Sequence, residues 1–108
     1  MCCRYGLRSS PDLRPIVEAA ERSPLTERFT TQLNRPLVTE GEVRPTNLVP
    51  VIAPSKTGAR SVFPMVWGFS LPRSRSPLVN ARVKTAAVKP SFAESWRQRR
   101  CIVPASFY

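Results

Sequence analysis

The segment LVPVIAPSKTGARSVFPMVWGF, residues 48–69, holds two apolar stretches separated by a short polar one. Its first six residues are apolar and rich in β-branched side chains, a composition typical of a strand. Residues 54–58 contain the proline and glycine that turns favour. Residues 61–69 then return to an apolar, β-branched and aromatic pattern. Two strands joined by a short turn predict an antiparallel hairpin.

Outside the hairpin the pattern is mixed. After Asp12, a residue type favoured at the N-cap, apolar residues recur at helical spacing and Pro15 suits a first turn, which predicts a helix over residues 13–22. Residues 23–44 are predicted to be loop with at most one short helix, near residues 25–33. The other predicted elements are a strand at 2–7, an extended stretch at 78–82, a short helix carrying Phe92 and Trp96, and a strand at 101–108. Together they predict an α+β fold, mainly antiparallel, with a few short helices.

The composition excludes several classes of protein. The chain has 108 residues, enough for one small domain, and 42% of them are apolar, too many for ordinary disorder. It contains no histidine, so catalysis or metal binding by that side chain is excluded within it. No apolar run approaches the ~20 residues of a membrane helix, and the charged start is unlike a secretory signal. We therefore expect a cytoplasmic protein without a metal or other cofactor.

The three cysteines are expected to stay reduced, as thiols do in the cytoplasm. Cys2 and Cys3 are adjacent, which suits neither a structural disulfide nor the spacing of a zinc site. Cys101 lies in an apolar run and is expected to be a small buried hydrophobic residue.

Charge is unevenly distributed along the chain. Residues 1–42 hold six arginines and six acidic residues, whereas residues 43–108 hold eleven lysines or arginines and one acid, Glu94. The whole net charge of +10 therefore belongs to the second part. Such a segment attracts polyanions, and arginine suits bidentate contacts with phosphate. The alternative is a generic basic surface.

Five short segments, in this order, are similar to one family: residues 1–5 (MCCRY), 44–52 (RPTNLVPVI), 65–69 (MVWGF), 80–85 (NARVKT) and 99–108 (RRCIVPASFY). Together they resemble the SRAP family, the SOS response-associated peptidases or abasic-site processing proteins. The resemblance covers the whole chain. Because that family is roughly twice as long, it implies that residues 1–108 are the N-terminal portion of a single, truncated SRAP domain. It also implies that an active-site Glu would follow Tyr108 directly and that a His would lie further on.

The resemblance implies that Met1 is removed and that Cys2 is the catalytic residue. An N-terminal cysteine carries an amine and a thiol on adjacent carbons, and the amine has an ordinary pKa of ~7.7–8.0. The amine can attack the aldehyde of a ring-opened abasic sugar, and the thiol can then close a thiazolidine ring. The expected activity is thus a covalent cross-link to abasic sites in single-stranded DNA.

Other site residues follow from matches to the family's motifs. Asn80 matches an active-site asparagine that can hold the opened sugar, the alternative being a turn asparagine. Arg4 and Arg82 match residues near DNA phosphates, and an internal ion pair is disfavoured for them because acids are scarce. Pro45 matches a loop beside the cysteine. Arg75 lies where many members carry tryptophan, so charge would replace a wedge between bases.

Several residues depart from the family's pattern or allow two interpretations. Cys3 replaces a glycine, Lys84 replaces an acid, and Ser106 replaces a common glycine. Trp67 is expected in the core rather than as a base-stacking platform, because it lies within an apolar run.

Two rival functions remain open. Cys2 could attack a peptide bond, as the name peptidase implies, or the chain could be a basic nucleic-acid-binding fragment without chemistry. The expected partner is single-stranded DNA containing abasic sites, with no membrane and with the protein as a monomer.

Overall fold

The computed structural model describes residues 3–108. Its elements are β1 (Tyr5–Leu7), α1 (Arg14–Arg22), α2 (Pro24–Leu33), β2 (Gly41–Val43), β3 (Leu48–Pro54), β4 (Arg60–Val66), α3 (Val83–Ala86) and α4 (Ala93–Gln98). They form two antiparallel two-stranded sheets, β1–β2 and β3–β4, with helices on either side. The predicted α+β class is confirmed.

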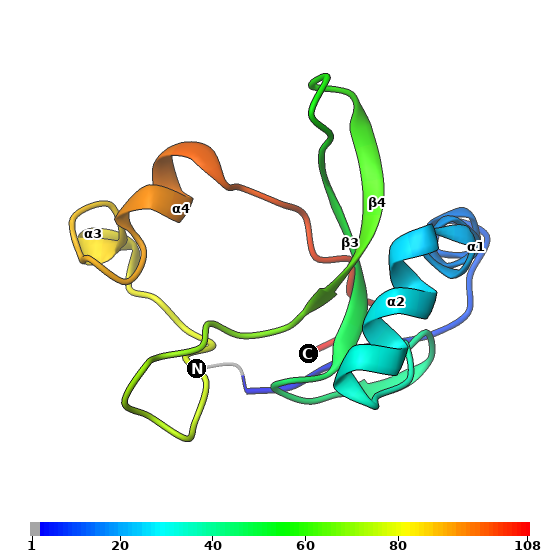
Figure 1. Cartoon of the computed structure of the whole chain (residues 1–108), viewed down its shortest axis with the longest axis horizontal. Coiled ribbons are helices and arrows are strands. Elements are labelled where there is room, and N and C mark those ends of the chain that lie inside the picture. Colours follow the sequence, from blue (N-terminus) through cyan, green and yellow to red (C-terminus); the bar gives the residue numbers. More distant parts are fainter. Residues whose placement is uncertain (1–2) are drawn as a thin grey trace.

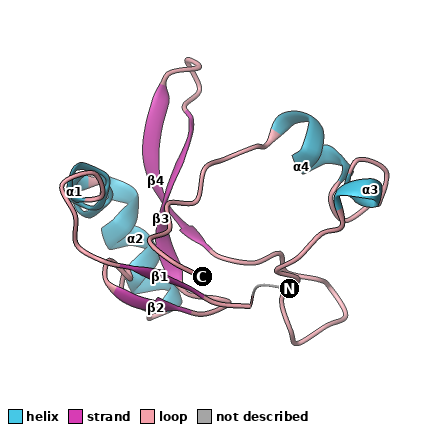
Figure 2. Cartoon of the chain, turned by 180° about the vertical axis from the view of Figure 1, so that it is seen from behind, coloured by secondary structure: helices cyan, strands magenta, loops and turns pink. Residues whose placement is uncertain are grey.

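The β3–β4 hairpin is the centre of the molecule (Figure 1). Helices α1 and α2 lie on one side of it and α3 and α4 on the other, and the view from behind shows β1–β2 crossing near its base (Figure 2). None of the described helices is long and apolar enough to cross a membrane.

Two prolines face each other within the hairpin, at the pair Pro50↔Pro64. Proline has no N–H to donate, so it is tolerated only where that group would point away from the partner strand. Ile52, two residues along and therefore of the same orientation, donates its N–H away from β4 to Ile102 O at 2.9 Å. The missing donor of Pro50 thus leaves the β3–β4 ladder intact.

The predicted helices are present, with one correction at an end. The N-cap of α1 is Leu13 and not Asp12, and Ser10 Oγ accepts from Leu13 N at 3.1 Å. Helix α2 is capped as its sequence favours: Ser23 Oγ accepts from Leu25 N, and Asn34 closes the helix in the left-handed region at φ 51°.

The predicted strand at residues 101–108 is wrong. Only two isolated bridges form there, Ile52↔Ile102 and Gly6↔Phe107. Continued by two residues, the first bridge would pair Pro50 with Pro104, and neither has an N–H to donate. The ladder therefore stops after one pair.

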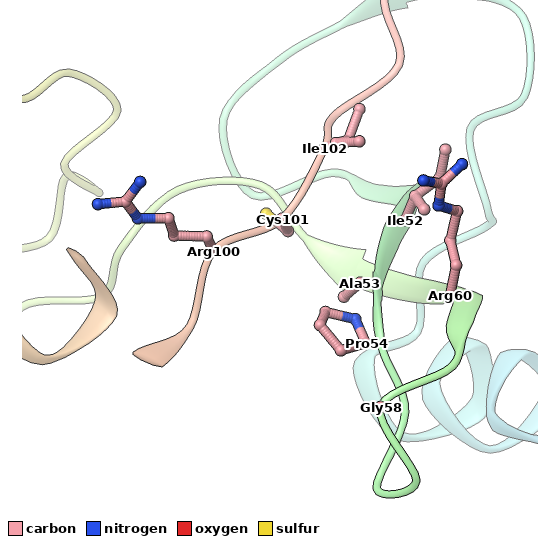
Figure 3. Close-up of a pocket in the computed structure, with 8 residues that line it drawn as sticks. All are labelled: Ile52, Ala53, Pro54, Gly58, Arg60, Arg100, Cys101 and Ile102. Carbon is pink, nitrogen blue, oxygen red and sulfur yellow. The ribbon is translucent and has the colours of Figure 1, made fainter. Parts of the chain in front are cut away.

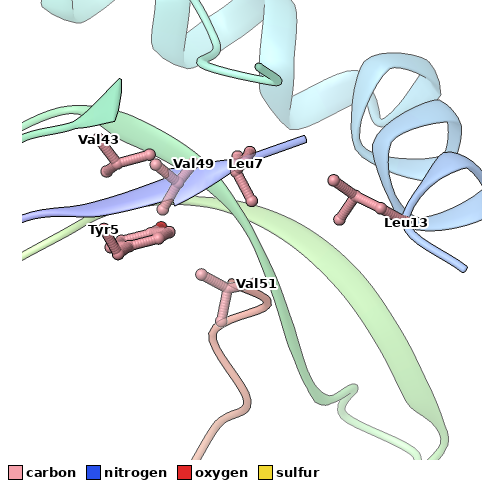
Figure 4. Close-up of a cluster of buried hydrophobic side chains, with 6 residues drawn as sticks. All are labelled: Tyr5, Leu7, Leu13, Val43, Val49 and Val51. Carbon is pink, nitrogen blue, oxygen red and sulfur yellow. The ribbon is translucent and has the colours of Figure 1, made fainter. Parts of the chain in front are cut away.

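A cluster of buried side chains lies where β1, β2, β3 and the start of α1 meet (Figure 4). Val43 and Val49 are fully buried, and Val17, Val38, Met65 and Trp67 pack against the cluster from outside. The six members are Tyr5, Leu7, Leu13, Val43, Val49 and Val51. Because β1 opens with Tyr5, this cluster fixes the backbone from which Arg4 projects.

Candidate functional site

A carboxylate lies between two guanidinium groups beside β1. Glu42 Oε1 accepts from Arg4 Nη1 at 3.0 Å, and Glu42 Oε2 lies 3.1 Å from both Nε and Nη2 of Arg44. These hydrogen bonds, that from Arg4 first, lower the pKa of Glu42. All three side chains are exposed, with Arg4 57% and Glu42 43% accessible. The expectation that Arg4 would lack an internal ion pair is therefore wrong.

The loop after β2 is held firmly against the end of β4. Arg44 N donates to Asn47 Oδ1 at 2.8 Å, Thr46 N donates to Trp67 O at 2.9 Å, and Trp67 N donates to Asn47 O at 2.9 Å. Arg35 adds a hydrogen bond from Nη1 to Thr46 O at 2.6 Å. Thr46 has φ 77°, a conformation that costs about 1–3 kcal/mol and persists only where surrounding contacts impose it. Pro45, predicted to shape the site, is half-buried in this fixed loop.

Tyr5 and Trp67 join these two features. Their rings meet edge to face with centroids 5.1 Å apart, and Trp67 packs against the core as predicted. Burial raises the pKa of Tyr5 to about 12, and its hydroxyl has no hydrogen-bond partner among residues 3–108. This side chain therefore stays neutral throughout the physiological range.

A second group of predicted residues follows Trp67 in the chain. Phe69 and Leu78 exchange backbone hydrogen bonds of 2.8 and 2.9 Å and close the loop that carries Arg75. Gly68 has φ 108°, and a Cβ there would lie 3.0 Å from Pro77 Cβ, so this turn requires glycine. Asn80 and the N-cap of α3, Arg82, come directly after this bridge, and both are exposed, as is Arg75.

The last of the five segments lies against β1. Gly6 N donates to Phe107 O at 2.8 Å, and Ser106 N donates to Gly6 O at 2.8 Å. Ser106 Oγ also accepts from Arg8 N at 2.8 Å, so this departure from the family's glycine supplies an acceptor to the end of β1. Cys101 is exposed, and the prediction that it is buried is wrong.

The structure thus connects all five segments. Arg4 and Pro45 are linked through Glu42 and Arg44, and residues 67–69 connect them to the segment that carries Asn80 and Arg82. Cys2 lies outside the described residues, whereas Cys3 is free and exposed. Within residues 3–108, no three His, Cys, Asp or Glu side chains are grouped as a metal site.

A cavity of about 490 Å³ lies elsewhere, between the tip of the hairpin and residues 100–102 (Figure 3). Its walls are mostly apolar, with Arg60 on the hairpin side and Arg100 on the other. Arg100 points away from it and stacks over the ring of Trp96 at 4.6 Å. None of the predicted site residues lines this cavity.

Sequence reasoning missed Glu42, Arg44 and Arg35. A signal existed for the first two, because residues two apart on a strand point to the same face. Recognising it required the strand β2, whose three residues contain a single buried side chain, Val43. Arg35 belongs to no motif in the sequence, and only the folded chain brings its guanidinium to Thr46 O.

Comparison with known proteins identifies a family and one fold. The family described as SOS response associated peptidase (SRAP) matches residues 1–108. The crystal structure of a protein from Bordetella bronchiseptica superposes with a TM-score of 0.54 at 19% identity, over 96% of this chain and 48% of that one. The chain therefore spans about half the length of that protein. Curated proteins give no significant match.

Proposed function

The chain belongs to the SOS response associated peptidase (SRAP) family, and from this premise we propose that it binds single-stranded DNA and forms a covalent cross-link at abasic sites through Cys2. The observation that carries the proposal is the connection of the five family-like segments around β1 and residues 67–69. Trp67 and residues 106–107, distant in sequence, thereby contact the strand that Cys2 precedes.

The bonds of the proposed adduct are formed by groups of one residue, Cys2. The neutral α-amine of Cys2 attacks the aldehyde carbon of the ring-opened sugar, and loss of water leaves an imine. The thiol then adds across the C=N bond: sulfur bonds to carbon, and its proton goes to nitrogen. The product is a five-membered thiazolidine, with one water released and no change of oxidation state. A cysteine inside the chain has no free amine and cannot complete this ring.

Binding is assigned to three exposed cations. Arg4 directly precedes β1, whereas Arg75 and Arg82 follow residues 67–69 in the chain, and each guanidinium can form paired hydrogen bonds with a phosphate. Between residues 43 and 93 there is no carboxylate to compete with DNA. Pro45 gives a rigid wall, and Asn80 offers an uncharged donor and acceptor for the opened sugar.

Denaturing gels with an oligonucleotide that contains one abasic site test the chemistry. Cys2→Ala is expected to abolish the shifted band, while Cys3→Ala and Cys101→Ala retain it. Cys3 and Cys101 are suitable controls because both are free, exposed thiols. Asn80→Ala should slow the reaction without abolishing it, since orientation is lost and not the bond-forming groups. A band that persists in Cys2→Ala would assign the link to another nucleophile.

Peptide cleavage is the second candidate, and the family's description as a peptidase favours it. Here the thiol of Cys2 would attack a peptide carbonyl. A peptide-hydrolysis assay beside the abasic-DNA assay separates the two. The unaltered protein should show only one of the activities, and Cys2→Ser should remove it. Salt-sensitive DNA binding that survives Cys2→Ser, with neither activity in the unaltered chain, would instead favour a binding fragment.

A further inference from the structure

Arg4 directly precedes β1, and Arg44 directly follows β2. The register of the two strands is Tyr5↔Val43, Gly6↔Glu42 and Leu7↔Gly41, and its continuation by one residue would set Arg4 opposite Arg44. Like charges directly opposite each other on neighbouring strands repel. Glu42 offsets this repulsion by giving one carboxylate oxygen to each guanidinium, at 3.0 Å and 3.1 Å.

Two arginines could hold a phosphate group in the same way as Arg4 and Arg44 hold this carboxylate. A phosphate, like a carboxylate, presents oxygens that can accept from two guanidinium groups at once. The three side chains together carry a charge of +1, and the Arg35 guanidinium donates a hydrogen bond to Thr46 O in the loop that begins at Arg44. The position between Arg4 and Arg44 thus already holds one anionic group, the carboxylate of Glu42.

Exchange of that occupant is feasible because the ion pairs are exposed. Arg44 is 63% accessible and Arg4 57%, and exposed pairs of this kind contribute only about 0–1 kcal/mol. The backbone that carries Arg44 is fixed by the hydrogen bonds from Arg44 N to Asn47 Oδ1 and from Thr46 N to Trp67 O. A change of anion thus needs a side-chain movement of Glu42 and no rearrangement of the strands.

We propose that Arg4 and Arg44 form a binding site for a nucleic-acid phosphate and that Glu42 is a built-in competitor, which the phosphate displaces from at least one guanidinium. Glu42 then weakens binding to undamaged DNA. The inference rests on the DNA partner of the proposed function and not on its covalent step.

Fluorescence anisotropy with a short, undamaged oligothymidylate tests this directly. Glu42→Gln should raise affinity roughly three- to tenfold at low salt, because a negative charge within about 4 Å of the phosphate position is removed. The slope of log K against log salt should become steeper by about 0.7, the contribution of one further neutralised phosphate on a single strand. Glu21→Gln, the same change on the exposed side of α1, is the matched control and should alter affinity less than twofold.

Coupling to the arginines makes the test specific. In the Arg4→Ala, Arg44→Ala double variant, Glu42→Gln should no longer raise affinity, because no guanidinium remains to be released. Circular dichroism of each variant checks that the fold is retained. The inference would be overturned by equal effects of Glu42→Gln and Glu21→Gln or by weaker binding in Glu42→Gln. It would also be overturned if neither the unaltered protein nor Glu42→Gln bound DNA. A missing cross-link to abasic DNA, with the affinity gain intact, would contradict only the proposed chemistry.

Discussion

Residues 3–67 and residues 68–108 differ in how many of their apolar side chains are buried. All six members of the core cluster come from residues 5–51. The second region buries only Ala86 and Phe92 among its hydrophobic residues. Most of the large apolar side chains that remain exposed belong to it: Phe69, Val83, Val88, Trp96, Ile102, Val103, Phe107 and Tyr108.

The difference shows that stability and charge are separated along this chain. The first region supplies the packed scaffold, and the second supplies most of the net positive charge, with eight lysines or arginines and one acid. The two are joined by isolated backbone bridges at Gly6–Phe107 and Ile52–Ile102. The proposed site draws on both, since Arg4 belongs to the first region and Arg82 to the second.

Truncating one buried and one exposed side chain of equal size is the strongest test of this separation. Leu48→Ala, at a fully buried position of β3, should lower the free energy of unfolding by about 2–5 kcal/mol. Ile102→Ala, 57% exposed, should change it by no more than about 0.5 kcal/mol. Urea denaturation followed by circular dichroism measures both. Similar losses for the two variants would mean that the second region is as tightly packed as the first.

The contact between Gly6 and Phe107 tests how the regions are joined. A Cβ at Gly6 would lie 2.0 Å from Phe107 Cζ, so Gly6→Ala should destabilise the protein by roughly 1–3 kcal/mol. In a Phe107→Ala background the same change should cost less than about 0.5 kcal/mol, because the ring is gone. A penalty that stays unchanged in the double variant would show that the strain arises within β1 itself.

Titration of Tyr5 measures the burial of the first region. In Tyr108→Phe, which leaves a single tyrosine, absorbance at alkaline pH should report a pKa of about 12 in the folded protein and its ordinary value of 10 after unfolding. The unfolded chain then loses the Tyr5 proton first. The contribution of Tyr5 to stability should therefore be fully present below pH 10 and be lost as pH rises towards 12. A folded-state pKa of 10 would contradict the buried position of this hydroxyl.

Arginine substitutions test the separation of charge, with the smallest expected effect. Arg75→Ala should weaken binding to single-stranded DNA roughly fivefold at 0.1 M salt and reduce the salt slope by about 0.7. Arg22→Ala, at the end of α1 in the electrically balanced first part, should alter affinity less than twofold. Equal losses would indicate a general attraction of the whole chain for DNA.

Much of the fold could be predicted because its signals are local. The hairpin, α1 and α2 are each encoded by periodicity, proline and turn residues within one stretch. Strand β2 could not be predicted, since three residues with one buried side chain become a strand only by pairing with β1. The failure at residues 101–108 has the same origin: the apolar pattern favoured a strand, but its register sets Pro104 against Pro50.

The candidate site was predictable only where motifs named its residues. Arg4, Pro45, Asn80, Arg75 and Arg82 were identified by type and order, and those assignments stay predictions. The ion pairs of Glu42 could not be derived, because the scarcity of acids says nothing about where the few present lie. The exposure of Cys101 was missed for a related reason: an apolar run indicates burial only if another element covers it.

The identity of the cross-linked residue tests whether Cys2 forms the covalent link. After reaction with abasic DNA, nuclease treatment, alkylation and trypsin, mass spectrometry should find the sugar remnant on the peptide Cys2–Arg4, with Met1 absent. That peptide should carry one alkyl group, on Cys3, because the sulfur of Cys2 is consumed in the ring. A remnant on a lysine, a peptide that retains Met1, or two alkylated cysteines beside the remnant would contradict the account.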